Sequence, residues 1–181
     1  YFMTNVLKRR CYSLGMLAFL AGVVMDQVTK YLAVVNLKDK EPVILIKNVF
    51  QLQYLENRGA AFGIFQNQKV FFVLIGVFML MIGMFFFTKM PFEKRYTPLR
   101  WCLVFIMTGA VGNMIDRVCH NYVIDFLYLS LINFPIFNVA DIFVTVATFI
   151  LLCLILFYYK EEDMDLMTDL LLHRKKGTTN E

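Results

Sequence analysis

Two aspartates in the second half of the chain have the residue type and surroundings for acid–base chemistry. Asp125 stands alone in the apolar run Val-Ile-Asp-Phe-Leu, and Asp141 follows Asn138 by three residues near the start of a long apolar stretch. When two carboxyl groups face each other in a poorly hydrated site, one pKa rises while the other stays low. Such a pair can hold a water molecule, take its proton and protonate a departing amine, which is how aspartic proteases hydrolyse amides. We therefore predict that Asp125 and Asp141 form a catalytic pair.

Four further charged side chains interrupt apolar sequence: Asp26, Lys30, Asp116 and Arg117. An ionisable side chain within a membrane costs at least about 2.5 kcal/mol on insertion scales, so each of these residues needs a physical reason. Asp26 and Lys30 are four residues apart, and a helix would let them neutralise each other along one face. Asp116 and Arg117, which follow Asn113 by three and four residues, have an alternative role as a structural ion pair between helices.

The two predicted catalytic aspartates also have structural alternatives. Asn138 and Asp141 are spaced as in a helix capping box, where the helix dipole favours an acidic side chain. Asp125 has no basic residue close to it in sequence, so a purely structural role explains it least well. Capping and catalysis are both compatible with the sequence at Asp141.

The elements that must position these residues are four apolar stretches, each close to the roughly 20 residues that a helix needs to cross a bilayer. They extend over residues 11–35, 70–87, 99–118 and 136–159. The chain of 181 residues is 59% hydrophobic and 18% charged, which is unusual for a water-soluble domain. We predict an all-α membrane protein with four transmembrane helices and a small β element, forming a single domain over residues 3–181. Tyr1 and Phe2 precede Met3, which we take as the native start.

Clusters of basic residues indicate how these helices cross the membrane. The clusters lie before the first helix, between the second and third, and after the fourth, so the positive-inside rule places these regions and both termini in the cytoplasm. The end of the first helix, the end of the third and the start of the fourth then share one depth. All six charged side chains converge there, near the outer leaflet, where water can arrive. The net charge of +4 is scattered along the chain, so nucleic acid is not an expected partner.

The outer loop, residues 36–69, is predicted to fold. Its segment 43–55 is rich in β-branched and aromatic residues and has Asn48 as a turn candidate, which indicates a hairpin or small sheet. Small residues follow at 59–63, and a short interfacial helix is expected after them.

The tail after Lys160 is charged and carries apolar residues at helical spacing, so we expect an amphipathic helix on the inner surface. The cysteines have no metal-ligand spacing, and we expect them to pack as small apolar residues without a metal site. They are Cys11, Cys102, Cys119 and Cys153.

Five short motifs occur in order along the chain. They are Asp26-Gln-Val-Thr-Lys30, Asn57-Arg-Gly-Ala-Ala-Phe-Gly63, Gly112-Asn-Met-Ile-Asp-Arg117, Val123-Ile-Asp-Phe126 and Phe137-Asn-Val-Ala-Asp141. On a chain of this length with four predicted membrane helices, the series resembles the ordered motifs of lipoprotein signal peptidase, also called signal peptidase II. The resemblance spans residues 26–141. The chain departs from the family pattern in an extended outer loop and a longer charged tail.

The resemblance implies a bacterial membrane aspartyl endopeptidase that cleaves the signal peptide from prolipoproteins, just before the cysteine that carries a diacylglyceryl group. It implies an outer β-cradle and a short interfacial helix between the first two membrane helices. It also implies diacylglyceryl-prolipoproteins and membrane lipids as partners, and the antibiotic globomycin as an inhibitor. No metal or organic cofactor is expected, and we expect a monomer.

By motif position, Asp125 and Asp141 correspond to the catalytic pair of the family, in agreement with the choice made from their surroundings. The resemblance assigns the other polar motif residues to substrate binding or to support of the site. Residues that resemble those lining the substrate site are Asn57, Asn113, Arg117 and Asn138, and Gly59 belongs to the same binding or supporting set. Asp26, Lys30 and Asp116 resemble structural polar positions, and their exact role stays open.

Two other classes of protein also contain polar residues among apolar helices. A small ion-coupled carrier would need charges near the membrane midplane and an internal repeat, and the sequence has neither. A scaffold protein would account for the apolar helices but not for Asp125 and Asp141 together.

Overall fold

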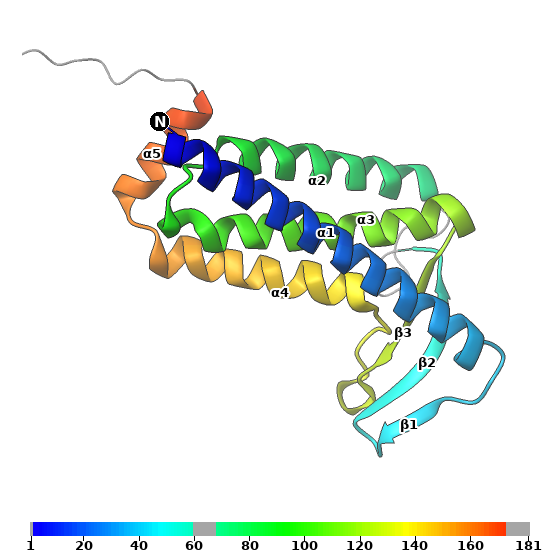
Figure 1. Ribbon diagram of the computed structural model, residues 1–181. Coiled ribbons are helices and arrows are strands. Elements are labelled where there is room, and N and C mark those ends of the chain that lie inside the picture. Colours follow the sequence, from blue (N-terminus) through cyan, green and yellow to red (C-terminus); the bar gives the residue numbers. More distant parts are fainter. Residues whose placement is uncertain (1, 60–67, 173–181) are drawn as a thin grey trace, which may run out of the picture.

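The described residues contain four long helices. They lie side by side, with a small sheet at one end of the bundle (Figure 1). The structure is a computed structural model that describes residues 2–59 and 68–172. All four helices are long and apolar enough to cross a membrane, which confirms the predicted membrane fold. They are α1 (Phe2–Leu37), α2 (Lys69–Lys89), α3 (Thr97–His120) and α4 (Val139–Cys153).

The helix boundaries differ from the predicted ones by a few residues, except at the beginning of α1. That helix includes the basic residues before the apolar stretch, because charged side chains do not end a helix. The fourth helix begins three residues after its predicted start, because Asn138 caps α4 and Phe137 exchanges backbone hydrogen bonds with Leu127. After Cys153, α4 continues into a π-helical turn, Leu154–Tyr158.

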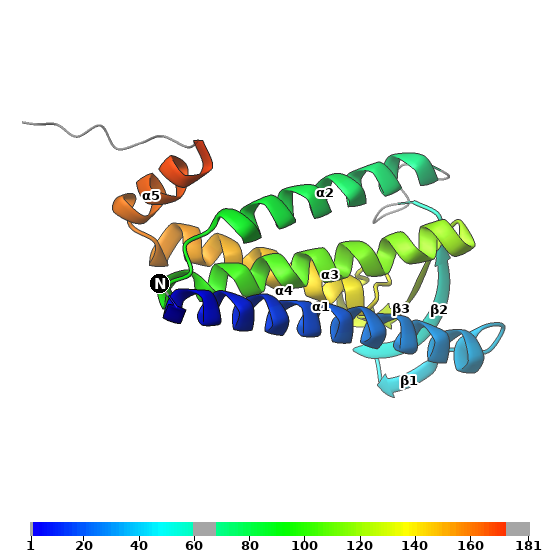
Figure 2. The ribbon, with the colours of Figure 1, turned by 45° about the horizontal axis from the view of Figure 1, so that its top comes forward.

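Helix α3 is the central element of the bundle, since α1, α2 and α4 all pack against it. In Figure 2 it runs between α2 above and α1 below. Gly109 allows a close approach to α4, because a side chain at this position would overlap the backbone carbonyl of Ala140.

The sheet is antiparallel, with the strand order β1-β2-β3. Strands β1 (Val43–Ile46) and β2 (Phe50–Asn57) form the predicted hairpin, and Asn48 adopts the left-handed conformation of its turn, with φ 59°. Strand β3 (Val123–Tyr128) follows α3 and pairs with β2. No helix or strand was predicted for residues 123–128, and this short apolar run, which contains Asp125, is a strand of the sheet.

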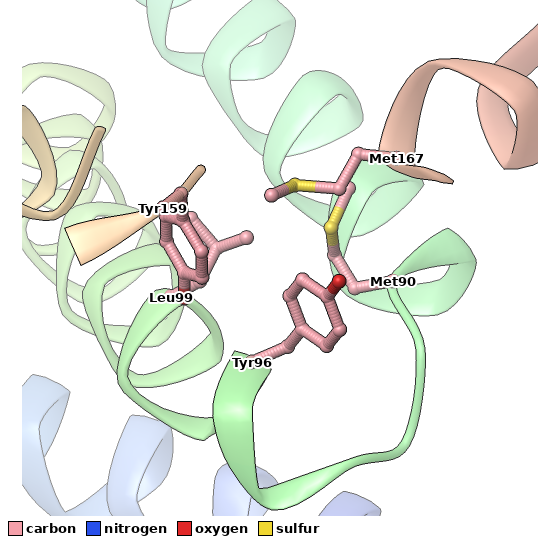
Figure 3. Packing of buried hydrophobic residues seen from close by; sticks show 5 residues of the cluster. All are labelled: Met90, Tyr96, Leu99, Tyr159 and Met167. Atoms are coloured by element: carbon pink, nitrogen blue, oxygen red, sulfur yellow. The ribbon is translucent and has the colours of Figure 1, made fainter. Parts of the chain in front are cut away.

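The amphipathic helix predicted in the tail is α5 (Glu161–Leu172), which lies at the end of the bundle away from the sheet (Figure 1). Its Met167 packs into a cluster with Met90, Tyr96, Leu99 and Tyr159 (Figure 3). The predicted interfacial helix after residue 63 falls in segment 60–67, which lies outside the described residues.

Candidate active site

Asp125 lies on β3 and is held by hydrogen bonds from β2 and from the residue that caps α4. Asn57 is paired with Val123 across β2 and β3, two residues from Asp125, so both side chains lie on one face of the sheet. Asn57 Nδ2 donates to Asp125 Oδ2 at 2.8 Å, and Asn138 Nδ2 donates to Asp125 Oδ1 at 2.6 Å. Each carboxyl oxygen of this buried residue therefore has a donor.

Asp141 lies in the first turn of α4 and completes the predicted capping box. Its Oδ2 accepts from the backbone nitrogen of Asn138 at 3.1 Å, and its own backbone nitrogen donates to Asn138 Oδ1 at 3.0 Å. Its Oδ1 accepts from Asn113 Nδ2 on α3 at 2.7 Å. The cap fixes the orientation of the carboxyl group while α3 supplies a second donor.

Asn138 joins the two predicted catalytic aspartates. It is completely buried, and besides Asp125 its Nδ2 contacts Asn113 Oδ1 at 3.1 Å. Asn113 Oδ1 also accepts from Lys30 Nζ at 3.0 Å. A continuous polar network thus runs from α1 through α3 to both aspartates.

Behind these residues lies a buried charged cluster of Asp26, Lys30 and Asp116, each at most 1% exposed. Lys30 Nζ lies 2.9 Å from Asp26 Oδ2 and 2.9 Å from Asp116 Oδ2. The carboxylates also accept from backbone nitrogens, Asp26 from Ala140 and Asp116 from Ile124. The predicted pairing of Asp26 with Lys30 is present. Asp116 pairs with Lys30 rather than with Arg117, because consecutive helical residues point in different directions.

Arg117 turns toward the sheet. Its Nη2 donates to the carbonyl of Gly59 at 3.3 Å, and its guanidinium stacks over Phe72 with Cζ 4.5 Å from the ring centroid. The backbone nitrogen of Gly59 donates to Asn57 Oδ1 at 3.0 Å. Arg117, Gly59 and Asn57 therefore form a chain that leads back to Asp125.

A cavity of about 300 Å³ opens beside the two aspartates. Six of the ten residues predicted from the sequence line it: Asn57, Gly59, Asn113, Arg117, Asp125 and Asp141. The other four, Asn138 and the three residues of the charged cluster, are buried behind its wall. Within residues 2–59 and 68–172, no three His, Cys, Asp or Glu side chains gather as possible metal ligands.

The pKa of Asp125 depends on its burial and on the neighbouring Asp141. Burial raises the pKa of Asp125 to about 7, and the charge of Asp141 adds to this rise. The hydrogen bonds from Asn57 and Asn138 oppose the rise, because they stabilise the charged form. Asp125 is therefore suited to keep a proton near neutral pH.

Sequence reasoning did not assign a role to several residues that contact the site. Gln27 Nε2 donates to Asp116 Oδ1 at 3.0 Å and to the carbonyl of Gly112 at 3.2 Å, so it links α1 to α3 beside the charged cluster. Its position beside Asp26 in an apolar stretch was the available signal. Phe72 and Thr145 line the cavity, and nothing distinguishes them from other helical residues in sequence.

The chain is similar to known membrane proteases along most of its length. The family described as signal peptidase (SPase) II matches residues 18–157. The lipoprotein signal peptidase of Clostridium tetani is 40% identical over 146 residues, covering 78% of this chain and 89% of the relative. That of Streptococcus thermophilus is 42% identical, covering 81% and 92%.

Two solved structures, both described as bacterial membrane enzymes, have the same fold. One has a TM-score of 0.68 and 27% identity, covering 93% of this chain and 95% of that chain. The other has a TM-score of 0.69 and 28% identity, covering 81% and 95%. The chain therefore belongs to the signal peptidase II family, the bacterial multi-pass membrane aspartyl proteases that remove signal peptides from prolipoproteins.

Proposed function

We propose that this chain cleaves diacylglyceryl-modified prolipoproteins immediately before the lipidated cysteine, with Asp125 and Asp141 as the catalytic pair. The observation that carries the proposal is the position of both carboxyl groups. They line one cavity, and both are bound to Asn138 on the opposite side. Each is held by two hydrogen bonds, so neither needs to reorganise when a substrate arrives.

In this mechanism a water molecule is the nucleophile. Ionised Asp141 takes one proton from the water as its oxygen attacks the scissile carbonyl carbon, and protonated Asp125 gives its proton to the carbonyl oxygen. The tetrahedral intermediate then collapses. Asp141 gives its proton to the departing amine nitrogen, the C–N bond breaks, and the new carboxylic acid returns a proton to Asp125. Both groups end in their starting states.

The remaining site residues position the catalytic pair and the substrate. Asn57, Asn113 and Asn138 orient the two carboxyl groups through the hydrogen bonds described above. Arg117, which lines the cavity beside Gly59, binds the peptide backbone of the substrate or globomycin. The charged cluster of Asp26, Lys30 and Asp116 supports these residues from behind.

The lipid of the substrate acts as a measure of depth. Its acyl chains are already in the membrane, so little free energy is gained by burying them again on binding. Specificity then comes from holding the scissile bond at the level of the two aspartates. This requires the catalytic pair near the outer leaflet. The proposal also includes both termini in the cytoplasm, a monomeric chain, and a single domain over residues 3–181.

The experiment is cleavage of a diacylglyceryl-modified prolipoprotein peptide by the detergent-purified protein, followed by gel shift. Asp125→Asn and Asp141→Asn should each abolish cleavage, because an amide cannot act as the required acid or base. Asp39→Asn, in the exposed turn after α1, is the matched control and should keep full activity.

Two further arms of the experiment test substrate and inhibitor. Globomycin should block cleavage, and a peptide whose cysteine lacks the lipid should be cleaved far more slowly. Turnover by either folded aspartate variant would contradict the assignment of Asp125 and Asp141 as the catalytic pair. Equal cleavage of the two peptides would contradict the proposed role of the lipid in specificity.

A further inference from the structure

A second polar cavity lies at the opposite end of the bundle from the catalytic pair. It has a volume of about 270 Å³ and opens between the beginning of α1, the beginning of α3 and the segment that connects α2 to α3. Its polar wall contains Arg100 and Lys94, and Phe92 and Trp101 contribute aromatic surface. The proposed mechanism uses none of these residues.

Arg100 is a buried cation with unused hydrogen-bonding capacity. It is 3% exposed, and its Nη2 donates to the carbonyls of Met90 and Pro91. Its Nε is buried and has no hydrogen-bond partner, and no carboxylate lies within ion-pair distance of it among the described residues. A buried charge is costly without a partner of opposite charge, so this guanidinium lacks an anion.

Further cations gather around the same cavity. The ring of Phe92 carries two of them: Arg100 Cζ lies 4.1 Å from its centroid and Lys8 Nζ lies 5.2 Å from it. Lys94 lines the wall, and Glu93 is the single acidic residue among the lining residues. Three cations against one carboxylate favour an anionic ligand that is able to accept several hydrogen bonds, such as a phosphate.

A second, apolar cavity, here called the apolar channel, adjoins the polar one. This cavity of about 340 Å³ runs between α1, α2 and α3, and the two share Gly15, Phe87 and Val104 in their walls. Its other lining residues are aromatic or aliphatic, or methionine, among them Phe19 and Met84. Positive charge at the end of a membrane helix bundle, followed by an apolar channel along the helices, matches a phosphate headgroup with an acyl chain.

We propose that this pair of cavities binds one anionic phospholipid, with its phosphate at Arg100, Lys94 and Lys8 and one acyl chain along the apolar channel. The lipid comes from the leaflet opposite the catalytic pair, which is the inner leaflet in the proposed orientation. The bound phosphate completes the hydrogen bonding of Arg100 and offsets the repulsion between Arg100 and Lys8. The site is separate from Asp125 and Asp141, so it stands or falls independently of the peptidase mechanism.

The position of Trp101 provides a direct readout, because it lines the polar cavity and is the only tryptophan of the chain. Phosphatidylglycerol with brominated acyl chains is titrated into the full-length protein in detergent micelles, and quenching of tryptophan fluorescence is followed. Saturable quenching is expected, and unbrominated phosphatidylglycerol should reverse it. Inorganic phosphate and unbrominated diacylglycerol should not, because each lacks one half of the ligand. Full reversal by inorganic phosphate would show that the site binds a free anion rather than a lipid.

Substitutions at the two exposed lysines test the headgroup site without disturbing the core. Lys8→Gln and Lys94→Gln should each weaken the binding of phosphatidylglycerol about fivefold, as expected for one basic residue near an anionic lipid. Lys47→Gln, on the distant β-hairpin, removes the same charge and should leave binding unchanged. Arg100→Gln should remove saturable binding. If the loss of the hydrogen bond to the Met90 carbonyl prevents this variant from folding, the two lysine variants still test the headgroup site.

Non-saturable quenching, or equal binding by the lysine variants and the wild-type protein, would overturn the site. Cleavage of the prolipoprotein peptide is measured on the same preparations. Lys8→Gln should cleave normally while it binds lipid weakly, which separates this inference from the proposed function.

Discussion

Asn138 is both the cap of α4 and the link between the two aspartates. Its side-chain oxygen accepts from the backbone of Asp141, and its Nδ2 donates to Asp125 on β3. The spacing of Asn138 and Asp141 was enough to predict the cap from sequence. The contact with Asp125 was not predictable, because it depends on how the turn before α4 folds against the sheet. The presence of both sets of contacts also shows that capping and a place in the site are not exclusive alternatives for Asp141.

The first prediction concerns the pH dependence of cleavage. Asp125 must be protonated in the proposed mechanism, so kcat/KM should fall as pH rises through its pKa of about 7. The hydrogen bond from Asn57 stabilises the charged form, so Asn57→Ala should raise this pKa further. The alkaline limb of the pH profile should therefore move to higher pH, while the maximal rate falls about tenfold through poorer orientation.

The measurement is kcat/KM for the wild-type and Asn57→Ala proteins between about pH 5 and pH 9. Gln53→Ala, earlier on the same strand, is the control and should keep the wild-type profile. A limb that stays in place, or moves to lower pH, would contradict the role of protonated Asp125.

At the scale of elements, Lys30 joins three helices and a strand through the carboxylates it neutralises. Asp26 lies on α1 with Lys30, and its carboxylate accepts a hydrogen bond from the backbone nitrogen of Ala140 on α4. Asp116 on α3 accepts a hydrogen bond from the backbone nitrogen of Ile124 on β3. The pairing along α1 followed from a spacing of four residues. The second carboxylate could not be foreseen, because sequence does not tell which faces of two distant helices meet.

Removal of Lys30 should be strongly destabilising. Lys30→Met leaves two buried carboxylates without a cation, at an expected cost of about 3–5 kcal/mol. Adding Asp26→Asn and Asp116→Asn to this variant removes the uncompensated charges, so much of the stability should return. Thermal unfolding in detergent measures both effects. A single variant as stable as wild type, or a triple variant less stable than the single one, would contradict this account of the cluster.

The contact between α3 and α4 depends on Gly109. Gly109→Ala places a methyl group against the backbone carbonyl of Ala140, which cannot move without shifting α4, and should cost about 1–3 kcal/mol. Gly76→Ala on α2 is the matched control, because its methyl group would lie 3.4 Å from the flexible Met114 side chain. Its unfolding temperature should equal or exceed that of wild type, since alanine favours helix. Equal loss of stability in both variants would show that Gly109 has no special packing role.

The sheet was half predictable. A segment rich in β-branched and aromatic residues, with Asn48 as a turn candidate, was enough to predict β1 and β2. Strand β3 was missed because a short, mostly buried apolar run has no alternation, and periodicity cannot distinguish it from the end of a helix. Missing this strand did not affect the selection of Asp125 as a site residue.

At the scale of the whole molecule, the polar residues of the site lie together at the sheet end of the bundle. Long apolar stretches alone were sufficient to predict four membrane helices, because length and composition decide whether a helix can span a bilayer. The start of α4 was less predictable, since its cap and the backbone pairing of Phe137 with the sheet determine where it begins. The N-terminal end of α1 and α5 lie together at the opposite end of the bundle (Figure 1).

The proposed orientation predicts which positions can be reached from outside the cell. In a variant without native cysteines, Lys40→Cys, in the exposed turn after α1, should react with a membrane-impermeant maleimide in intact cells. Glu162→Cys on α5 should react only after the membrane is opened. Gel shift of the modified protein is the readout. The reverse pattern would place the catalytic pair on the cytoplasmic side.

The length of α2 has a consequence for the membrane in which the enzyme works. Its 21 residues, with a lysine at each end, span about 31 Å, which leaves almost no excess over a hydrocarbon core of about 30 Å. A thicker bilayer must thin around the protein or draw these lysines inward, and either response costs free energy for each ångström of mismatch. A substrate anchored by its own acyl chains follows the surface of the bilayer, whereas the two aspartates follow the bundle. Acyl-chain length in the host membrane should therefore set how well scissile bond and catalytic pair align, so that cleavage becomes slower as the bilayer thickens.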